Sequence, residues 1–254
     1  MRRAIALTLR SAMAAALWSA LPSHAAEVLV AVAANFAAPL QRIGQEFTAA
    51  SGHRLVLSSG ATGKFAAQIR AGAPFQVLLS ADAATPAALI GEGLAVPGSA
   101  FTYAIGRLAL WSADAGLVDA DGQVLASGRF RHLAIANPRS APYGAAAMLT
   151  LKARGLDQRL AAQIVTGESL AQTWQFVHSG QAELGFVALS QVLAAVPPAG
   201  SHWLVPAHLH APIRQDAVLL KPGADQPAAR ALLAWLKGPQ ARAVMQRWGY
   251  EAPL

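Results

Sequence analysis

The feature that most constrains the fold of this chain is the alternation of short apolar runs with amphipathic helical stretches. In the N-terminal third, each apolar run is followed by a pattern of helical period. Strands that alternate with helices require right-handed crossovers, so we predict an α/β fold with a mainly parallel sheet. The strands are expected at residues 28–33, 55–57 and 77–79, with helices at about 36–50 (ended by Gly52), at 63–71 and from the cap pair Thr85-Pro86 onward.

The same pattern restarts in the second half of the chain. No low-complexity linker separates the two α/β units, so we predict two lobes that share strands across a hinge. The first lobe is expected to comprise residues 26–104 plus the tail 215–254. The second lobe is expected to comprise residues 105–214. Further strands are expected at residues 108–111, 133–136, 184–187 and 218–220, with helices near 144–153, 157–164, 170–179, 228–236 and 239–248.

The N-terminal segment, residues 1–25, has the pattern of a cleaved signal peptide. Arg2 and Arg3 precede an apolar run at 12–21, and Ser23 and Ala25 provide the small residues of a cleavage site. A membrane anchor is the alternative, but the run is shorter than the roughly 20 apolar residues that span a bilayer. We therefore expect export to the periplasm and exclude this segment from the fold.

Composition removes several functional classes. Without its first 25 residues the chain keeps 17 Lys and Arg against 13 Asp and Glu, a net charge of +4, and these residues form no basic stripe. We therefore expect no nucleic-acid partner. We also expect the protein to be a monomer. The chain has no cysteine, which excludes disulfides, thiolate nucleophiles and cysteine-bound metals.

Four strand-to-helix junctions carry small or hydrogen-bonding residues. They contain Asn35, Thr62, the segment 137–144 and Ser169. In open α/β sheets ligands bind beyond the carboxyl ends of the strands, where helix N-termini offer N–H groups to anions. Any one of Asn35, Thr62 and Ser169 is explained as well by helix capping. The four junctions together favour an anion site between the lobes.

Other kinds of site find little support. The pair Gly63-Lys64 lacks the earlier glycine and the following Ser or Thr of a phosphate loop, since Ser58 and Phe65 occupy those places. His208 and His210 have no nearby carboxylate and indicate a solvated loop rather than a metal site. No G-x-S-x-G elbow is present, so an exported hydrolase is the least favoured hypothesis.

At these junctions the sequence resembles the periplasmic molybdate-binding proteins of ATP-driven importers. The matching stretches occur in the family's order over nearly the whole mature chain. They are residues 32–36, 59–64, 78–82, 136–138, 141–144, 184–187 and 236–241.

The resemblance implies a two-lobed periplasmic-binding-protein fold of type II that closes on molybdate or tungstate without chemistry on it. It implies ligand positions at Asn35, at the Thr62 hydroxyl, at Tyr143 and at the backbone N–H of Leu170, with Ala34 and Gly63 as flanking donors. It implies no cofactor, no metal other than molybdenum in the bound oxyanion, and a membrane permease as partner.

Two positions depart from the family pattern. Some members place a ligand tyrosine where this chain has Ala188, and many carry an acidic residue where it has Gln76. We expect Tyr143 to supply the missing phenol and Gln76 to affect local packing. The main alternative is a receptor for another small oxyanion such as sulfate. A cage of donors suits any fully deprotonated oxyanion, and only its size would separate sulfate from molybdate.

Overall fold

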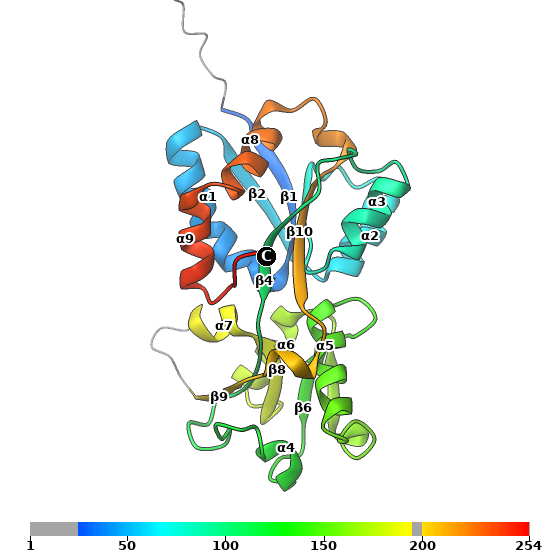
Figure 1. The fold of residues 1–254 in the computed structure, drawn as a ribbon, viewed down its shortest axis with the longest axis vertical. Coiled ribbons are helices and arrows are strands. Elements are labelled where there is room, and N and C mark those ends of the chain that lie inside the picture. The colour runs from blue at the N-terminus through cyan, green and yellow to red at the C-terminus, as the bar shows by residue number, and fades with distance from the viewer. Residues whose placement is uncertain (1–24, 195–199, 254) are drawn as a thin grey trace, which may run out of the picture.

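The computed structural model describes residues 25–194 and 200–253, which form two α/β lobes stacked along the long axis of the molecule (Figure 1). Strand β4 (Phe101–Gly106) leads out of the first lobe into β5 (Leu108–Ser112) of the second. After β9 (Ser201–Leu204) the chain returns through β10 (Ile213–Leu219), which pairs with β4. The predicted two-lobed fold is thereby confirmed, whereas the predicted signal segment lies, apart from Ala25, outside the described residues.

The first lobe is built on a mixed sheet in the order β2-β1-β3-β10-β4. Helices α1, α8 and α9 pack on one face and α2 and α3 on the other (Figure 1). Its remaining elements are β1 (Glu27–Ala33), α1 (Ala37–Ser51), β2 (Arg54–Gly60), α2 (Thr62–Arg70), β3 (Val77–Leu79), α3 (Ala84–Gly91), α8 (Pro227–Leu236) and α9 (Pro239–Arg247), with short 3-10 turns at Ala34–Phe36 and Lys221–Gly223.

The second lobe repeats this plan with the order β7-β6-β8-β5-β9. Helix α5 packs on one face of the sheet and α6 on the other. Its remaining elements are α4 (Val124–Ser127), β6 (Leu133–Ala136), α5 (Pro142–Ala153), β7 (Ile164–Gly167), α6 (Leu170–His178), β8 (Leu184–Ala188) and α7 (Leu189–Ala194), with 3-10 turns at Ala161–Gln163 and Ala207–Leu209.

Helix α1 illustrates how the sequence pattern becomes structure. Leu40, Ile43 and Phe47 recur at helical spacing and are all buried against the first sheet. Gly52 ends the helix in the left-handed conformation, with φ of 75°. The helix thus begins at the carboxyl end of β1 and leaves the junction that contains Asn35 at the edge facing the second lobe.

The sheets are mixed rather than mainly parallel. In the part of the chain that the structure describes, each sheet has two parallel and two antiparallel pairings. The difference in the first lobe has a simple cause: the chain leaves through β4 and returns through β10, so these strands must run in opposite directions. The predicted lobe boundaries, after residue 104 and before residue 215, fall inside these two connecting strands.

Some local predictions are wrong. Residues 157–164 form turns and a short 3-10 segment rather than a helix, and Ile164 already begins the edge strand β7. Helix α3 begins at Ala84, one residue before the predicted cap. The Asp82 carboxylate accepts the Thr85 N–H at 2.7 Å, so Thr85 is a donor in the first turn and not the cap.

Candidate functional site

A small cavity lies between the lobes at the junctions β1–α1, β2–α2, β6–α5 and β7–α6. Its empty space, including the part open to solvent, is about 210 Å³. We call it the small cavity. Its lining residues are Ala33, Ala34, Asn35, Gly60, Ala61, Thr62 and Ala81 from the first lobe and Ala141, Pro142, Tyr143 and Leu170 from the second. The predicted ligand residues Asn35, Thr62, Tyr143, Leu170 and Ala34 are therefore together on its wall.

Thr62 forms part of the first-lobe wall at the start of α2. Its side chain is buried, and its Oγ1 accepts the N–H of Ala81 at 3.0 Å. It is thus no helix cap but a link between the second and third junctions of this lobe. Because the hydroxyl accepts this bond, its hydrogen remains available as a donor.

Tyr143 and Leu170 form the second-lobe wall at the first turns of α5 and α6. Both residues are buried. The N–H groups in the first turn of a helix have no partner within the helix, so α2, α5 and α6 direct N–H groups and partial positive charge at the cavity. Ser169 caps α6, since its Oγ accepts the N–H of Gln172 at 3.4 Å. Helix capping, rather than anion binding, therefore explains this side chain.

Asn35 is buried and joined to residues far away in the sequence. Its Nδ2 donates to Gln215 Oε1 at 2.8 Å and to Tyr250 Oη at 3.0 Å. Its Oδ1 is buried without a hydrogen-bond partner. Both Nδ2 hydrogens thus serve the protein, and direct donation to an anion requires that one of them be released.

A buried polar network lies behind the small cavity. The Tyr250 hydroxyl donates to the backbone oxygen of Asn35 at 2.7 Å, and Ser190 Oγ in the second lobe donates to the same oxygen at 2.9 Å. Gln215 Oε1 also accepts from the Tyr103 hydroxyl at 3.0 Å, and Gln215 Nε2 donates to Tyr143 Oη at 3.1 Å.

Sequence reasoning missed the network residues Tyr103, Ser190, Gln215 and Tyr250. The polar run Arg214-Gln215-Asp216, directly before an apolar strand, is the one signal that pointed to a buried polar position.

The tyrosines of this network stay protonated. Burial raises the pKa of the Tyr143 hydroxyl well above its usual value, and burial likewise raises the pKa values of Tyr103 and Tyr250. The hydroxyls therefore remain neutral donors at physiological pH.

The charged residues near the junctions do not line the small cavity. Lys64 Nζ forms an exposed ion pair with Glu168 of the second lobe at 2.8 Å. The N–H of Gly63 donates to Ser140 O at 2.9 Å, also across the lobes, so this predicted donor is already engaged.

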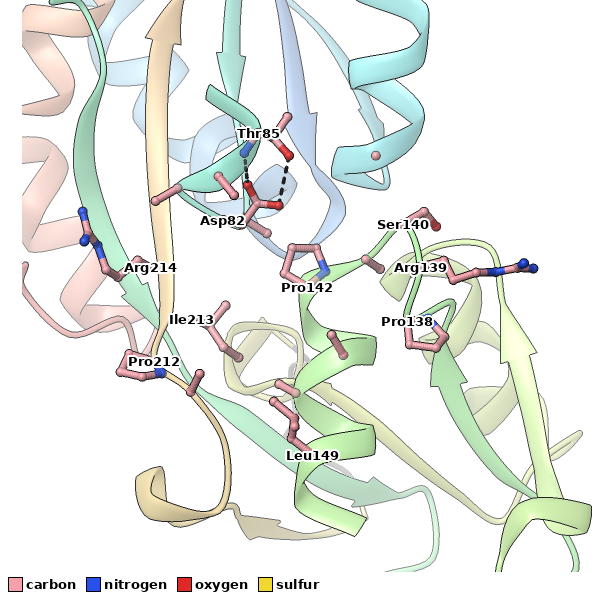
Figure 2. Close-up of a pocket in the computed structure, with 18 residues that line it drawn as sticks. Asp82, Thr85, Pro138, Arg139, Ser140, Pro142, Leu149, Pro212, Ile213 and Arg214 are labelled. Carbon is pink, nitrogen blue, oxygen red and sulfur yellow. Dashed lines mark hydrogen bonds between the residues drawn. The ribbon is translucent and has the colours of Figure 1, made fainter. Parts of the chain in front are cut away.

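A wider cleft opens beside the small cavity (Figure 2). Its walls carry Asp82, Arg139 and Arg214. Asp82 turns back to Thr85, while the two arginine side chains extend away from it on opposite sides (Figure 2). Among the described residues, no three His, Cys, Asp or Glu side chains cluster as metal ligands would. The small cavity, rather than the cleft, is the site with converging neutral donors.

Comparisons with known proteins agree with this geometry. Residues 28–251 match the family model described as bacterial extracellular solute-binding protein. The chain is 53% identical over 229 residues to the molybdate-binding protein ModA of Azotobacter vinelandii, covering 90% of this chain and 91% of that protein. It is 49% identical over 240 residues to the molybdate-binding protein ModA of Rhodobacter capsulatus, covering 94% of each.

The fold matches a solved structure as well. The periplasmic molybdate-binding protein of Azotobacter vinelandii superposes with a TM-score of 0.87 at 45% identity, covering 89% of this chain and all of that one.

Proposed function

Since the chain belongs to the family of bacterial extracellular solute-binding proteins, we propose that it captures molybdate, and tungstate, and delivers the anion to the permease of an ATP-driven importer. The proteins of this family bind solutes and are not enzymes. The chain accordingly holds its cargo as a substrate of transport, with no cofactor and no chemical step.

One observation carries the proposal: the small cavity is lined from both lobes by helix N-termini and neutral polar side chains. No Asp, Glu, Lys, Arg or His is among its described lining residues. Molybdate carries two negative charges, and each of its oxygens only accepts hydrogen bonds. Neutral donors satisfy such an anion, whereas a buried carboxylate would repel it.

We assign the donors as follows. The hydroxyls of Thr62 and Tyr143 and the backbone N–H groups of Ala34 and Leu170 bind the anion. Asn35 contributes either one released Nδ2 hydrogen or the position of its backbone. Donors thus come from both lobes, and the anion stabilises their closure by a hinge movement at β4 and β10.

Membership of this family supports a periplasmic location and a permease partner. We propose that residues 1–25 direct export and that the protein acts as a monomer in the periplasm, away from nucleic acid. In the described part of the chain, no helix is long and apolar enough to cross a bilayer.

The test is a thermal-unfolding panel with molybdate, tungstate, sulfate and phosphate, followed by titration calorimetry. A ligand at about 100 times its Kd adds about 2.7 kcal/mol of stability. We expect a large shift with molybdate and tungstate alone. A shift with sulfate instead would support anion binding between the lobes but refute molybdate as the ligand. No shift with any anion would refute the proposed function.

A further inference from the structure

Gln215 lies behind the small cavity and connects both of its walls. It sits on β10, one of the strands that join the lobes, and its side chain is fully buried. Its Oε1 accepts from Asn35 of the first lobe, and its Nε2 donates to Tyr143 of the second. Gln215 itself does not line the cavity.

The orientation of these amides is fixed by the hydrogen bonds around them. The Tyr250 hydroxyl gives its single hydrogen to the backbone oxygen of Asn35, which can only accept, or to Ser190 Oγ, whose own hydrogen goes to that same oxygen. Tyr250 Oη must then accept from the Asn35 side chain, so the atom at 3.0 Å is Nδ2. The Gln215 atom that faces this nitrogen must be Oε1, and the atom that faces Tyr143 must be Nε2.

This order determines what the Tyr143 hydroxyl can do. Its oxygen accepts the Gln215 N–H and also has the Asn35 amide as a hydrogen-bonding neighbour, and none of the hydrogen bonds described for Tyr143 uses its hydrogen. Tyr143 lines the small cavity, so the hydrogen is free for a ligand there. We infer that Gln215 is a positioning residue that holds the Tyr143 hydroxyl as a donor toward the anion, and so favours oxyanions that carry no proton. This inference rests on the proposed function.

The selectivity has a direct physical basis. Hydrogen phosphate and molybdate both carry two negative charges at about pH 8, but hydrogen phosphate also has a proton that needs an acceptor. A Tyr143 oxygen occupied by Gln215 leaves no acceptor at this point of the wall. Reversing the Gln215 amide would turn the hydroxyl hydrogen away from the ligand and leave an oxygen lone pair facing it.

The test is the substitution Gln215→Glu, which keeps the shape and replaces the N–H by an acceptor. We measure molybdate affinity by calorimetry, and the much weaker hydrogen phosphate affinity by its competition with molybdate at high phosphate concentration. Both are measured at about pH 8, where both anions have the same charge. Charge repulsion by the new carboxylate weakens both similarly, so their ratio isolates the hydroxyl's orientation. We expect molybdate affinity to fall about 10- to 100-fold beyond any change for hydrogen phosphate.

A pH series provides a second readout. Protonation of the introduced carboxyl would restore a donor to Tyr143, so molybdate affinity of the variant should recover as the pH falls from about 8 to about 6. The titratable groups around this position are Tyr103, Tyr143 and Tyr250, with Asp216 and Asp82 acting on Tyr103. Burial raises the pKa of each tyrosine, so no tyrosine titrates in this range.

The matched control is Gln163→Glu, which makes the same substitution at a half-buried glutamine that donates to the backbone oxygen of Phe130 and does not line the small cavity. Its molybdate-to-phosphate ratio should stay within about twofold of the wild type. Thermal unfolding of each variant shows whether it is folded.

The outcomes separate the two proposals. Wild-type protein that binds no tetrahedral oxyanion refutes the proposed function and this inference with it. If the wild type binds molybdate but Gln215→Glu loses molybdate and hydrogen phosphate equally, without recovery at lower pH, only the inference fails. If Gln215→Glu does not fold, Gln215→Met takes its place, because it removes the N–H without adding charge. The ratio of molybdate to hydrogen phosphate affinity should still fall in this variant. An unchanged ratio overturns the inference.

Discussion

The two lobes meet at two regions of opposite character. Behind the small cavity, Gln215 contacts Tyr143 and Ser190 contacts the backbone of Asn35, and all four residues are buried. At the surface, Lys64 pairs with Glu168, and their side chains are 49% and 58% exposed. Water and salt weaken the exposed pair but not the buried bonds. The positions of the groups around the ligand therefore depend on the buried hydrogen bonds, while the exposed ion pair contributes little stability.

The most severe break of the buried region is Gly106→Ala. A Cβ at Gly106 would collide with Tyr143 Oη and Gln215 Nε2, so the tyrosine must leave its place. Overpacking of this kind costs about 1–3 kcal/mol of folding stability. We expect molybdate affinity, measured by calorimetry, to fall about 100-fold, because the donor is displaced as well. Gly91→Ala is the control, since a Cβ there meets nothing within 4 Å; equal behaviour of the two variants would refute the argument.

A milder change in the same region is Tyr143→Phe, which removes only the hydroxyl. The loss of one donor to a charged ligand should reduce molybdate affinity about 10- to 100-fold. It also leaves the buried Gln215 N–H unsatisfied, which should lower the free energy of unfolding by about 1–3 kcal/mol. Calorimetry and urea unfolding measure the two effects. Unchanged affinity would exclude Tyr143 as a ligand.

The exposed region should respond weakly. Lys64→Ala removes the ion pair with Glu168 but no lining residue of the small cavity. We expect molybdate affinity to change by less than about threefold, and the difference to disappear in high salt. Lys221→Ala, at an exposed lysine of the first lobe, controls for the loss of charge. A large loss of molybdate affinity in Lys64→Ala but not in Lys221→Ala would show that the exposed ion pair matters for binding.

The smallest expected effect is the pH dependence of this pair. The hydrogen bond from Lys64 lowers the pKa of the Glu168 carboxyl below its usual value. A lowered folded pKa gives a contribution that is complete above the unfolded pKa of about 4.3 and is lost as the pH falls through the folded value. The stability difference between wild type and Glu168→Gln, measured by unfolding in dilute salt, should therefore close only in this acidic range. If the stability difference disappears near neutral pH, the lowered pKa of Glu168 is contradicted.

The sequence allowed the walls of the site to be predicted but not the residues behind them. Asn35, Thr62, Tyr143 and Leu170 follow strands whose carboxyl ends meet between the lobes, so local pattern and one topological rule suffice. Gln215 is 180 positions from Asn35, and its contact arises only once β10 enters the first sheet. Periodicity identified the apolar end of β10 and missed its polar start.

The short edge strand β7 was missed for a related reason. Only four residues form this edge strand, and their burial does not alternate, so the sequence pattern is too short to distinguish a strand from a helix.

The hydrogen bond between Tyr250 and Asn35 connects the order in which the chain is synthesised to the order in which the binding site forms. Tyr250 follows α9, whereas Asn35 follows β1, so the anchor of the first junction is synthesised more than two hundred residues after the junction itself. A chain still being made can form β1 and β2 yet lacks the hydroxyl that fixes Asn35. Tight anion capture should therefore arise as one of the last events in folding, after α9 has packed on the first lobe and brought Tyr250 to Asn35.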